Sequence, residues 1–260
     1  KDEIRTAFMR HATSKIDSFE DLENVLTLGF RGEALSSIAS VAQVEMLTRT
    51  ENDSMGTRIV INGGVVDREE ECAANVGTVF YVKNIFFNTP ARRKFLKKPA
   101  TEGSYISEIV NRIALGHPNI AIKYVNNGNI VLQTNGDGNV KNSLFYIYGK
   151  DIASKMLSLE SEKDGYILKG LVGKPELSRG NRNYENFFIN GRFIKSTLVQ
   201  NAVEDAYKNK IMIGKFPIFA LDLIVPSNTV DVNVHPTKLE VRFSDENFIY
   251  DLIYGAVLKV

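Results

Sequence analysis

Cysteine and histidine are scarce in this chain of 260 residues, and each scarcity excludes a kind of site. The single cysteine, Cys72, forms no disulfide within the chain, so the sequence excludes a disulfide-rich secreted scaffold and favours a reducing compartment. The three histidines are His11, His117 and His235, and their wide separation gives none of the short spacings typical of zinc ligands. We therefore expect no metal ligand set in these residues.

Long apolar runs and an excess of one charge are also missing. No stretch reaches membrane-spanning length and the start does not resemble a signal peptide, so we expect no membrane partner. The 32 lysines and arginines balance 31 aspartates and glutamates, which means that any contact with nucleic acid must use a local patch. The length suits two medium domains, and the turn-prone run 135–139 places their boundary between residues 137 and 138.

The most informative stretch runs from residue 29 to residue 41. Two glycines three positions apart, Gly29 and Gly32, permit a tight turn, and Glu33 stands where acidic residues favour the first turn of a helix. Apolar residues then recur at helical spacing, which predicts a buried face made of Leu35, Ile38, Ala39 and Ala42. A glycine loop before a helix N-terminus is typical of an anion site, and Arg31 adds a guanidinium suited to phosphate. A plain turn between two elements remains the alternative.

Two other places carry hydroxyl groups that suit a ligand. Thr13 and Ser14, followed by the ammonium of Lys15, have the chemistry to contact phosphate oxygens, although Ser and Thr near a helix end are also common caps. Thr78 stands at the start of a predicted strand, directly after Gly77. Alternatively, Thr78 stands there only because threonine favours strands.

Alternating and helical patterns predict a mixture of helices and strands along the whole chain. Helices are expected over 3–9, 104–115, 140–148, 198–207 and 248–260. Strands are expected over 44–48, 57–61, 79–82, 120–125, 130–133, 166–172, 184–189, 192–194, 216–225 and on both sides of His235-Pro236. Asn62-Gly63-Gly64 and Asn190-Gly191 are typical of hairpin turns between such strands. Between them, residues 91–98 carry five cations and no acid, which indicates a solvated face or a contact for phosphate or a partner.

Four segments, taken in order, resemble the MutL family of mismatch-repair ATPases. They are residues 10–16 (RHATSKI), 29–35 (GFRGEAL), 88–96 (NTPARRKFL) and 232–238 (VNVHPTK). The resemblance covers essentially the whole chain, and four multi-residue matches in order are far more specific than one glycine motif.

The resemblance implies an α+β fold. The first part, residues 1–137, is expected to be a two-layer ATP-binding domain with helices over a mixed sheet, of the GHKL type shared with type II topoisomerases and sensor histidine kinases. The second part, residues 138–260, is expected to be a ribosomal-protein-like βαβ domain.

The resemblance also implies a role for particular residues. Thr13, Ser14 and Lys15 match the family's phosphate-side contacts, and Thr78 matches a threonine that supports the adenine pocket. Lys238 matches the second-domain lysine that reaches the γ-phosphate. The lid over the triphosphate is matched by Gly29, Phe30, Arg31, Gly32, Glu33, Ala34 and Leu35. Arg192 and Lys195 match basic residues that face DNA, with the uncharged Thr197 where some relatives carry another cation.

The chain departs from the family at its beginning. The family's general-base glutamate, its Mg²⁺-binding asparagine and its adenine-reading Asp-x-Gly-x-Gly segment precede the position that matches Lys1. We therefore expect a fragment of a longer ATPase, N-terminally incomplete and lacking the C-terminal dimerisation domain. Without the base and the metal ligand, the 260 residues alone are expected neither to hydrolyse ATP nor to bind it tightly.

The resemblance implies a DNA mismatch repair clamp that uses ATP and Mg²⁺. It dimerises on ATP, binds DNA with little sequence specificity, and signals to a mismatch-recognition protein and downstream repair enzymes in the bacterial cytoplasm, near the nucleoid. Two alternatives stay open: a topoisomerase-type ATP gate, and a nucleotide-independent DNA-binding module that uses the cations of 92–98 with Arg192 and Lys195.

Overall fold

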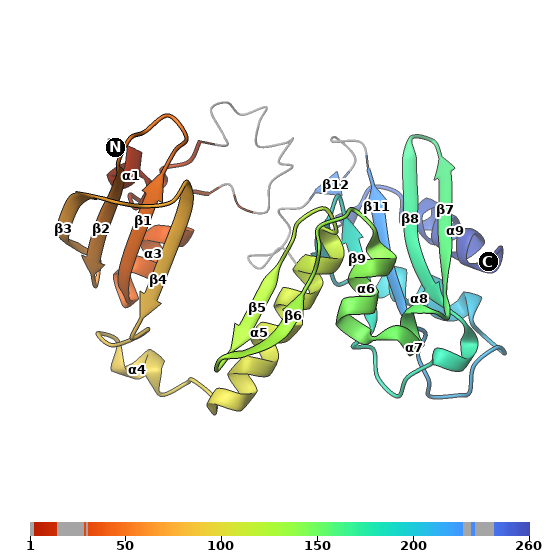
Figure 1. Cartoon of the computed structure of the whole chain (residues 1–260). Helices are drawn as coiled ribbons and strands as arrows, with labels where there is room; N and C mark the ends of the chain where they lie inside the picture. Colours follow the sequence, from red (N-terminus) through yellow and green to blue (C-terminus); the bar gives the residue numbers. More distant parts are fainter. Residues whose placement is uncertain (1–2, 15–28, 30, 226–229, 232–241) are drawn as a thin grey trace. The chain divides into compact units, whose positions relative to one another are not determined.

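The computed structural model describes residues 3–14, 29, 31–225, 230–231 and 242–260 (Figure 1). It contains two compact units, residues 1–98 and 99–260. The boundary predicted between residues 137 and 138 lies within the second unit. No helix in the described ranges has both the length and the apolar character needed to cross a bilayer.

An antiparallel sheet of four strands forms the centre of the first unit. Its order is β3-β2-β1-β4, and each neighbouring pair is antiparallel. The strands are β1 (Gln43–Arg49), β2 (Gly56–Asn62), β3 (Val65–Cys72) and β4 (Gly77–Lys83). Gly63 and Gly64 both have positive φ, so they make the predicted hairpin turn between β2 and β3. The strands predicted over 44–48, 57–61 and 79–82 are confirmed.

Helices cover one face of this sheet. They are α1 (Glu3–Ala7) and α3 (Ala34–Val41), while the short α4 (Pro90–Arg93) carries no buried residue. Ile4, Ala39 and Ala42 pack with Val44 and Met46 of β1 in a small core, together with β2 side chains. The helix predicted after the glycine loop is therefore confirmed.

The predicted details of these helices are wrong in two respects. Of the four residues expected to form the buried face of α3, Ala39 and Ala42 are buried, whereas Leu35 is half-buried and Ile38 is exposed. Periodicity marks a stripe of a helix, but the small core of this unit covers only the part near the sheet. The first helix ends at Ala7, because residues 8–10 form turns before His11 takes a positive φ.

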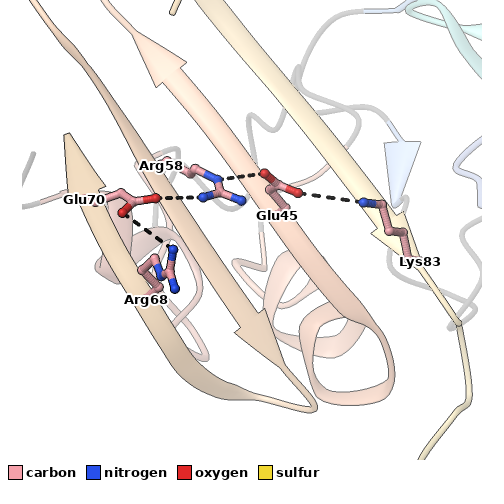
Figure 2. Close-up of polar contacts among 5 residues, drawn as sticks. All are labelled: Glu45, Arg58, Arg68, Glu70 and Lys83. Atoms are coloured by element: carbon pink, nitrogen blue, oxygen red, sulfur yellow. Dashed lines mark hydrogen bonds and ion pairs between the residues drawn. The ribbon is translucent and has the colours of Figure 1, made fainter. Parts of the chain in front are cut away.

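The opposite face of the sheet carries a row of alternating charges (Figure 2). Arg58 on β2 donates from Nε to Glu45 and from Nη1 to Glu70, each at 2.7 Å. Lys83 lies 3.8 Å from Glu45, and Arg68 lies 3.9 Å from Glu70. The two carboxylates raise the pKa of Arg58, chiefly through these hydrogen bonds. Each cation of this row thus faces a carboxylate.

The second unit is built on a mixed sheet of five strands in the order β10-β9-β11-β8-β7. Strands β9 and β11 are parallel and the other neighbours are antiparallel. The chain passes from β9 through β10 and a helix, α8, to β11, which makes a βαβ crossover. The elements are β7 (Met156–Lys163), β8 (Tyr166–Gly173), β9 (Glu185–Ile189), β10 (Arg192–Ile194), α8 (Thr197–Ala206) and β11 (Phe219–Ile224).

Helices pack on both faces of this sheet. One core joins α8 and α9 (Glu246–Leu258) to Phe187, Leu221 and Leu223 of the central strands. The other core joins α6 (Val140–Tyr148) and α7 (Lys150–Ala153) to Phe188 and Ala220, which point to the other side. Alternation along β9 and β11 therefore buries both faces. The remaining elements are β5 (Lys123–Asn126), β6 (Asn129–Gln133), the 3-10 helix η1 (Pro175–Leu177), β12 (Val230–Asp231) and β13 (Arg242–Phe243).

The capping residues explain most of the helix boundaries in this unit. Asn139 accepts from the backbone at the start of α6, Ser196 does so for α8, and Asp245 for α9. The long helix α5 (Pro99–Gly116) is the exception to prediction. Ser104 stands at the start of the helix predicted over 104–115 and has the chemistry of a cap, but it lies inside α5 and donates to the carbonyl of Ala100. Pro99, with its fixed φ, starts the helix five residues earlier.

Candidate functional site

Two of the four motif segments meet at the N-terminal end of α3. Gly32 has a φ of +61°, and a Cβ placed on it would lie 2.2 Å from the carbonyl oxygen of Ala12. Only glycine fits a backbone contact of this kind in this conformation. The segment 10–14 and the glycine loop are therefore packed backbone to backbone.

A side-chain contact joins the same two segments. His11 Nδ1 lies 3.2 Å from the carboxylate of Glu33, and His11 itself has a φ of +63°. Glu33 occupies the N-cap position of α3 but makes no capping hydrogen bond with its side chain. The carboxylate thus connects the loop to the neighbouring segment, and the backbone N–H groups of the first turn of α3 are not capped by it.

The third motif is attached to the other end of α3. Asn88 Nδ2 donates to the carbonyl of Ser40 at 2.9 Å, and the N–H of Phe86 donates to the carbonyl of Val41 at 2.6 Å. A Cβ on Gly63 would lie 3.0 Å from Asn88 Nδ2, so the β2–β3 turn packs there too. The helix α3 therefore contacts three of the four motif segments within one unit.

Thr78 lies on the helix-covered face of the sheet. It is exposed, and a Cβ on the preceding Gly77 would meet no atom within 4 Å. Its neighbour on the same face, Phe80, makes an edge contact with Phe8, whose ring centroid is 6.5 Å away. Phe8 shortly precedes the motif at residue 10, so Thr78 and that motif lie on the same side of the sheet. The hydroxyl of Thr78 also lies 2.8 Å from that of Thr48 on β1.

This arrangement fits a polyanion better than a metal ion. Exposed Arg31 and Ser14, half-buried Thr13, and the start of an eight-residue helix supply cationic, hydroxyl and N–H groups for phosphate oxygens. In contrast, the described residues contain no cluster of three His, Cys, Asp or Glu side chains able to hold a metal.

Some predicted site residues lie outside the described residues. These are Lys15 and Phe30 of the first two segments and Lys238 of the fourth. Gly29, Ala34 and Leu35 are described, with Ala34 opening α3. The predicted convergence of the loop amides with the Lys238 ammonium therefore stays a prediction.

The basic residues predicted to face DNA lie on and beside a hairpin of the second unit. Arg192 on β10 is half-buried, and burial lowers the pKa of its guanidinium, whereas Lys195 is exposed. The turn before them is fixed: Gly191 N–H donates to Asp222 at 3.0 Å, and Asn190 accepts from Val225 at 3.2 Å. Burial raises the pKa of Asp222. The hairpin signal Asn190-Gly191 is confirmed.

The other predicted basic feature, residues 92–98, belongs to the first unit. All of its side chains are exposed, and Phe95 among them is 81% exposed. The run is thus available for a polyanion, as predicted for a solvated face or a phosphate contact.

Sequence reasoning missed three functional candidates: His11, Thr48 and Asp222. His11 adjoins the predicted phosphate contacts, but only the fold reveals its pairing with Glu33. Thr48 was within reach of prediction, because antiparallel pairing of the strands at 44–48 and 79–82 brings Thr48 opposite Thr78 once the register is known. Asp222 carried no signal, since it stands inside an apolar strand.

Sequence comparison gives two matches that agree with each other. The family model described as "DNA mismatch repair protein, C-terminal domain" matches residues 144–260. A DNA mismatch repair protein MutL from Agathobacter rectalis is 50% identical over 259 residues, which is 98% of this chain and 40% of that protein. The chain thus spans about two-fifths of the length of this relative.

Two solved structures share the fold. One, described as the N-terminal domain of a DNA repair protein, has a TM-score of 0.75 at 20% identity and covers 99% of this chain and 81% of its own. The other, the Aquifex aeolicus MutL ATPase domain complexed with ADP, has a TM-score of 0.64 at 23% identity, over 91% of this chain and 80% of its own. These likenesses confirm the predicted α+β architecture.

Proposed function

This chain belongs to the MutL family of DNA mismatch repair proteins, and we propose that its first unit is part of an ATP-operated clamp. The observation that carries the proposal is the backbone contact of Gly32 with Ala12, which joins two motif segments at the N-terminus of α3. Because the chain spans about 40% of the length of its relative, the activity proposed is that of the full-length protein. We keep residues 1–137 as the proposed nucleotide domain and 138–260 as the proposed second domain.

In this proposal ATP lies with its phosphates at the start of α3. Thr13, Ser14 and Lys15 contact the phosphates on one side, and the lid from Gly29 to Leu35 covers them with its backbone amides and Arg31. Thr78 is directed to the adenine. The bound nucleotide supplies the energy of phosphate hydrolysis, and the chain's own residues bind and orient it.

Lys238 is proposed to contact the γ-phosphate. A cation that contacts only the triphosphate form distinguishes ATP from ADP, because the product lacks the group to which it binds. Nucleotide state then selects between two shapes of the protein, and the ATP form dimerises.

DNA is the proposed macromolecular ligand, held through Arg192 and Lys195. Guanidinium and ammonium groups bind phosphates without reading bases, so the expected binding is weakly sequence-specific and sensitive to salt. A mismatch-recognition protein and downstream repair enzymes are the proposed protein partners, and the bacterial cytoplasm is the proposed location.

A nucleotide-independent DNA-binding module remains the second candidate. The exposed cations of residues 92–98 favour it, since they form a polyanion contact without ATP. The two candidates differ in one measurable respect: only the clamp couples its DNA affinity or its dimerisation to a nucleotide. Membership of the MutL family leaves no support for the topoisomerase-type gate.

The test replaces the glycine at the junction of the two segments. In Gly32→Ala the new Cβ would lie 2.2 Å from a carbonyl oxygen, so the segments must separate. We expect the full-length variant to bind a non-hydrolysable ATP analogue at least about tenfold more weakly, since strain of 1–3 kcal/mol or more must be relieved by moving the site. Light scattering should show loss of analogue-dependent dimerisation.

The matched control is Gly180→Ala, because a Cβ there meets nothing within 4 Å. It should bind and dimerise as the wild type does. If Gly32→Ala lowers the melting temperature in the absence of nucleotide, Arg31→Met at an exposed position replaces it, provided that Arg31→Met melts at the temperature of the wild type. Unchanged analogue binding by a folded Gly32→Ala or by Arg31→Met would contradict the proposal.

A further inference from the structure

Two threonine hydroxyls face each other across the strands β1 and β4. Thr48 and Thr78 are directly opposite in the antiparallel register, and their Oγ1 atoms are 2.8 Å apart. On its other side Thr48 is paired with the buried Thr57 of β2, so three threonines form a row across one face of the sheet. The row ends at Thr78, which is exposed next to the open space around Gly77.

The chemistry of the pair limits what Thr78 can offer to a ligand. A hydroxyl has one proton to donate and two lone pairs that accept. When Thr48 donates to Thr78, the proton of Thr78 is left for an acceptor on its exposed side. The contact also fixes the direction in which the hydroxyl of Thr78 donates.

We propose that Thr48 is a positioning residue for base recognition, which fixes the hydroxyl of Thr78 as a hydrogen-bond donor toward the purine. This inference rests on the proposed function, in which Thr78 is directed to the adenine. Adenine carries an acceptor nitrogen at position 1 of its ring, whereas guanine carries a proton there. A donor held in place thus favours ATP over GTP, and a hydroxyl free to rotate accepts or donates equally well.

The test measures base preference in the full-length protein. Non-hydrolysable analogues of ATP and GTP are titrated against the wild type, Thr48→Val, Thr48→Ser, Thr78→Val and the double valine variant. Valine keeps the branched shape without the hydroxyl, and serine keeps the hydroxyl. We expect Thr48→Val and Thr78→Val each to weaken binding of the ATP analogue about five- to tenfold, the value of one hydrogen bond. Binding of the GTP analogue should not weaken, so the ATP preference falls by the same factor.

The double valine variant distinguishes a positioning role of Thr48 from a packing role. Because Thr48 acts through Thr78, the double variant should bind the ATP analogue no more weakly than Thr78→Val alone. Thr48→Ser, which keeps the hydroxyl, should keep the wild-type preference for the ATP analogue over the GTP analogue. The matched control is Thr57→Val, which alters the same row one strand further away and should leave the ratio of ATP to GTP affinities unchanged.

The possible results distinguish the positioning role of Thr48 from the placement of adenine at Thr78. If Thr48→Val keeps the wild-type preference while Thr78→Val loses it, the positioning role of Thr48 is wrong and the proposed function stands. Losses that multiply in the double variant, or equal losses for both analogues, also overturn the positioning role. If Thr78→Val binds both analogues as the wild type does, the placement of the adenine at Thr78 is itself wrong.

Discussion

A buried carboxyl group makes the stability of the second unit depend on pH. Glu185, the first residue of β9, has a side chain that is 0% exposed. Arg182 lies 3.9 Å away but donates instead to Glu204 of α8, at 2.6 and 3.1 Å. Burial, and next the negative charge of Glu204, raise the pKa of Glu185 to about 8, against the opposing effects of Arg182 and Gln200.

The sign follows from proton binding in the two states. In the unfolded chain Glu185 has a pKa near 4.5, so between pH 4.5 and about 8 the native state holds a proton that the unfolded state has released. The contribution of this group is therefore complete below pH 4.5 and is lost as the pH rises toward 8. Between pH 5 and pH 7 the loss amounts to about 2–3 kcal/mol, which is on the order of a 70-fold change in the unfolding equilibrium.

Glu185→Gln removes the titration and keeps the size of the side chain. We compare the rate of amide hydrogen exchange in β9 and α8 between the wild type and the variant at the same pH. The ratio of the wild-type rate to the variant rate should rise on the order of 70-fold from pH 5 to pH 7. The ratio cancels the intrinsic pH dependence of exchange. The control is Glu176→Gln. A hydrogen bond from Lys155 lowers the pKa of Glu176 below 4.5, so Glu176 stays ionised from pH 5 to pH 7 in both states. The ratio of the wild-type exchange rate to that of Glu176→Gln should therefore stay constant over this range. A constant ratio for Glu185→Gln would refute the reasoning.

Two further predictions concern the proposed clamp. Charge reversal in Arg192→Glu or Lys195→Glu should reduce the slope of log affinity for duplex DNA against log salt by about 1 per lost phosphate contact, whereas Lys141→Glu, at the start of α6, should leave it unchanged. An unaltered slope would remove both residues from the DNA contact. Lys238→Ala in the full-length protein should slow ATP turnover and weaken ATP-dependent closure without changing the melting temperature, and unaltered turnover and closure would exclude the γ-phosphate role.

Local signals predicted the strands and turns well, because these depend on a few adjacent residues. Asn190-Gly191 and the glycines after Asn62 form the expected hairpins, since their positive φ values are cheap for these residue types. The ends of the helices were predicted less accurately than the strands and turns. Ser104 has the chemistry of a helix cap, but α5 begins at Pro99, five residues before it. The capping preference of one residue therefore does not fix the start of the helix when the preceding residues are helical too.

The candidate site was predictable in its composition but not in its contacts. The motif residues could be named from the sequence, yet the contact of Gly32 with Ala12 joins residues twenty positions apart, and no local pattern encodes a contact over that separation. Likewise, the partial exposure of α3 depends on how little core the first unit provides near Ile38. Such facts belong to tertiary packing, which periodicity within one element does not encode.

The motifs contain two kinds of residue, and the structure separates them. Gly32 and Asn88 have their groups occupied within the fold: one by a backbone contact with Ala12, the other by a hydrogen bond to Ser40. Arg31 instead lies at an exposed position, where its guanidinium is accessible to a ligand. Replacing a residue of the first kind displaces α3 and everything attached to its two ends, whereas replacing one of the second kind removes a single ligand contact. Loss of nucleotide binding therefore indicates a ligand contact only where the melting temperature is unchanged. This criterion, rather than membership of a motif, tests which residues belong to the proposed ATP site.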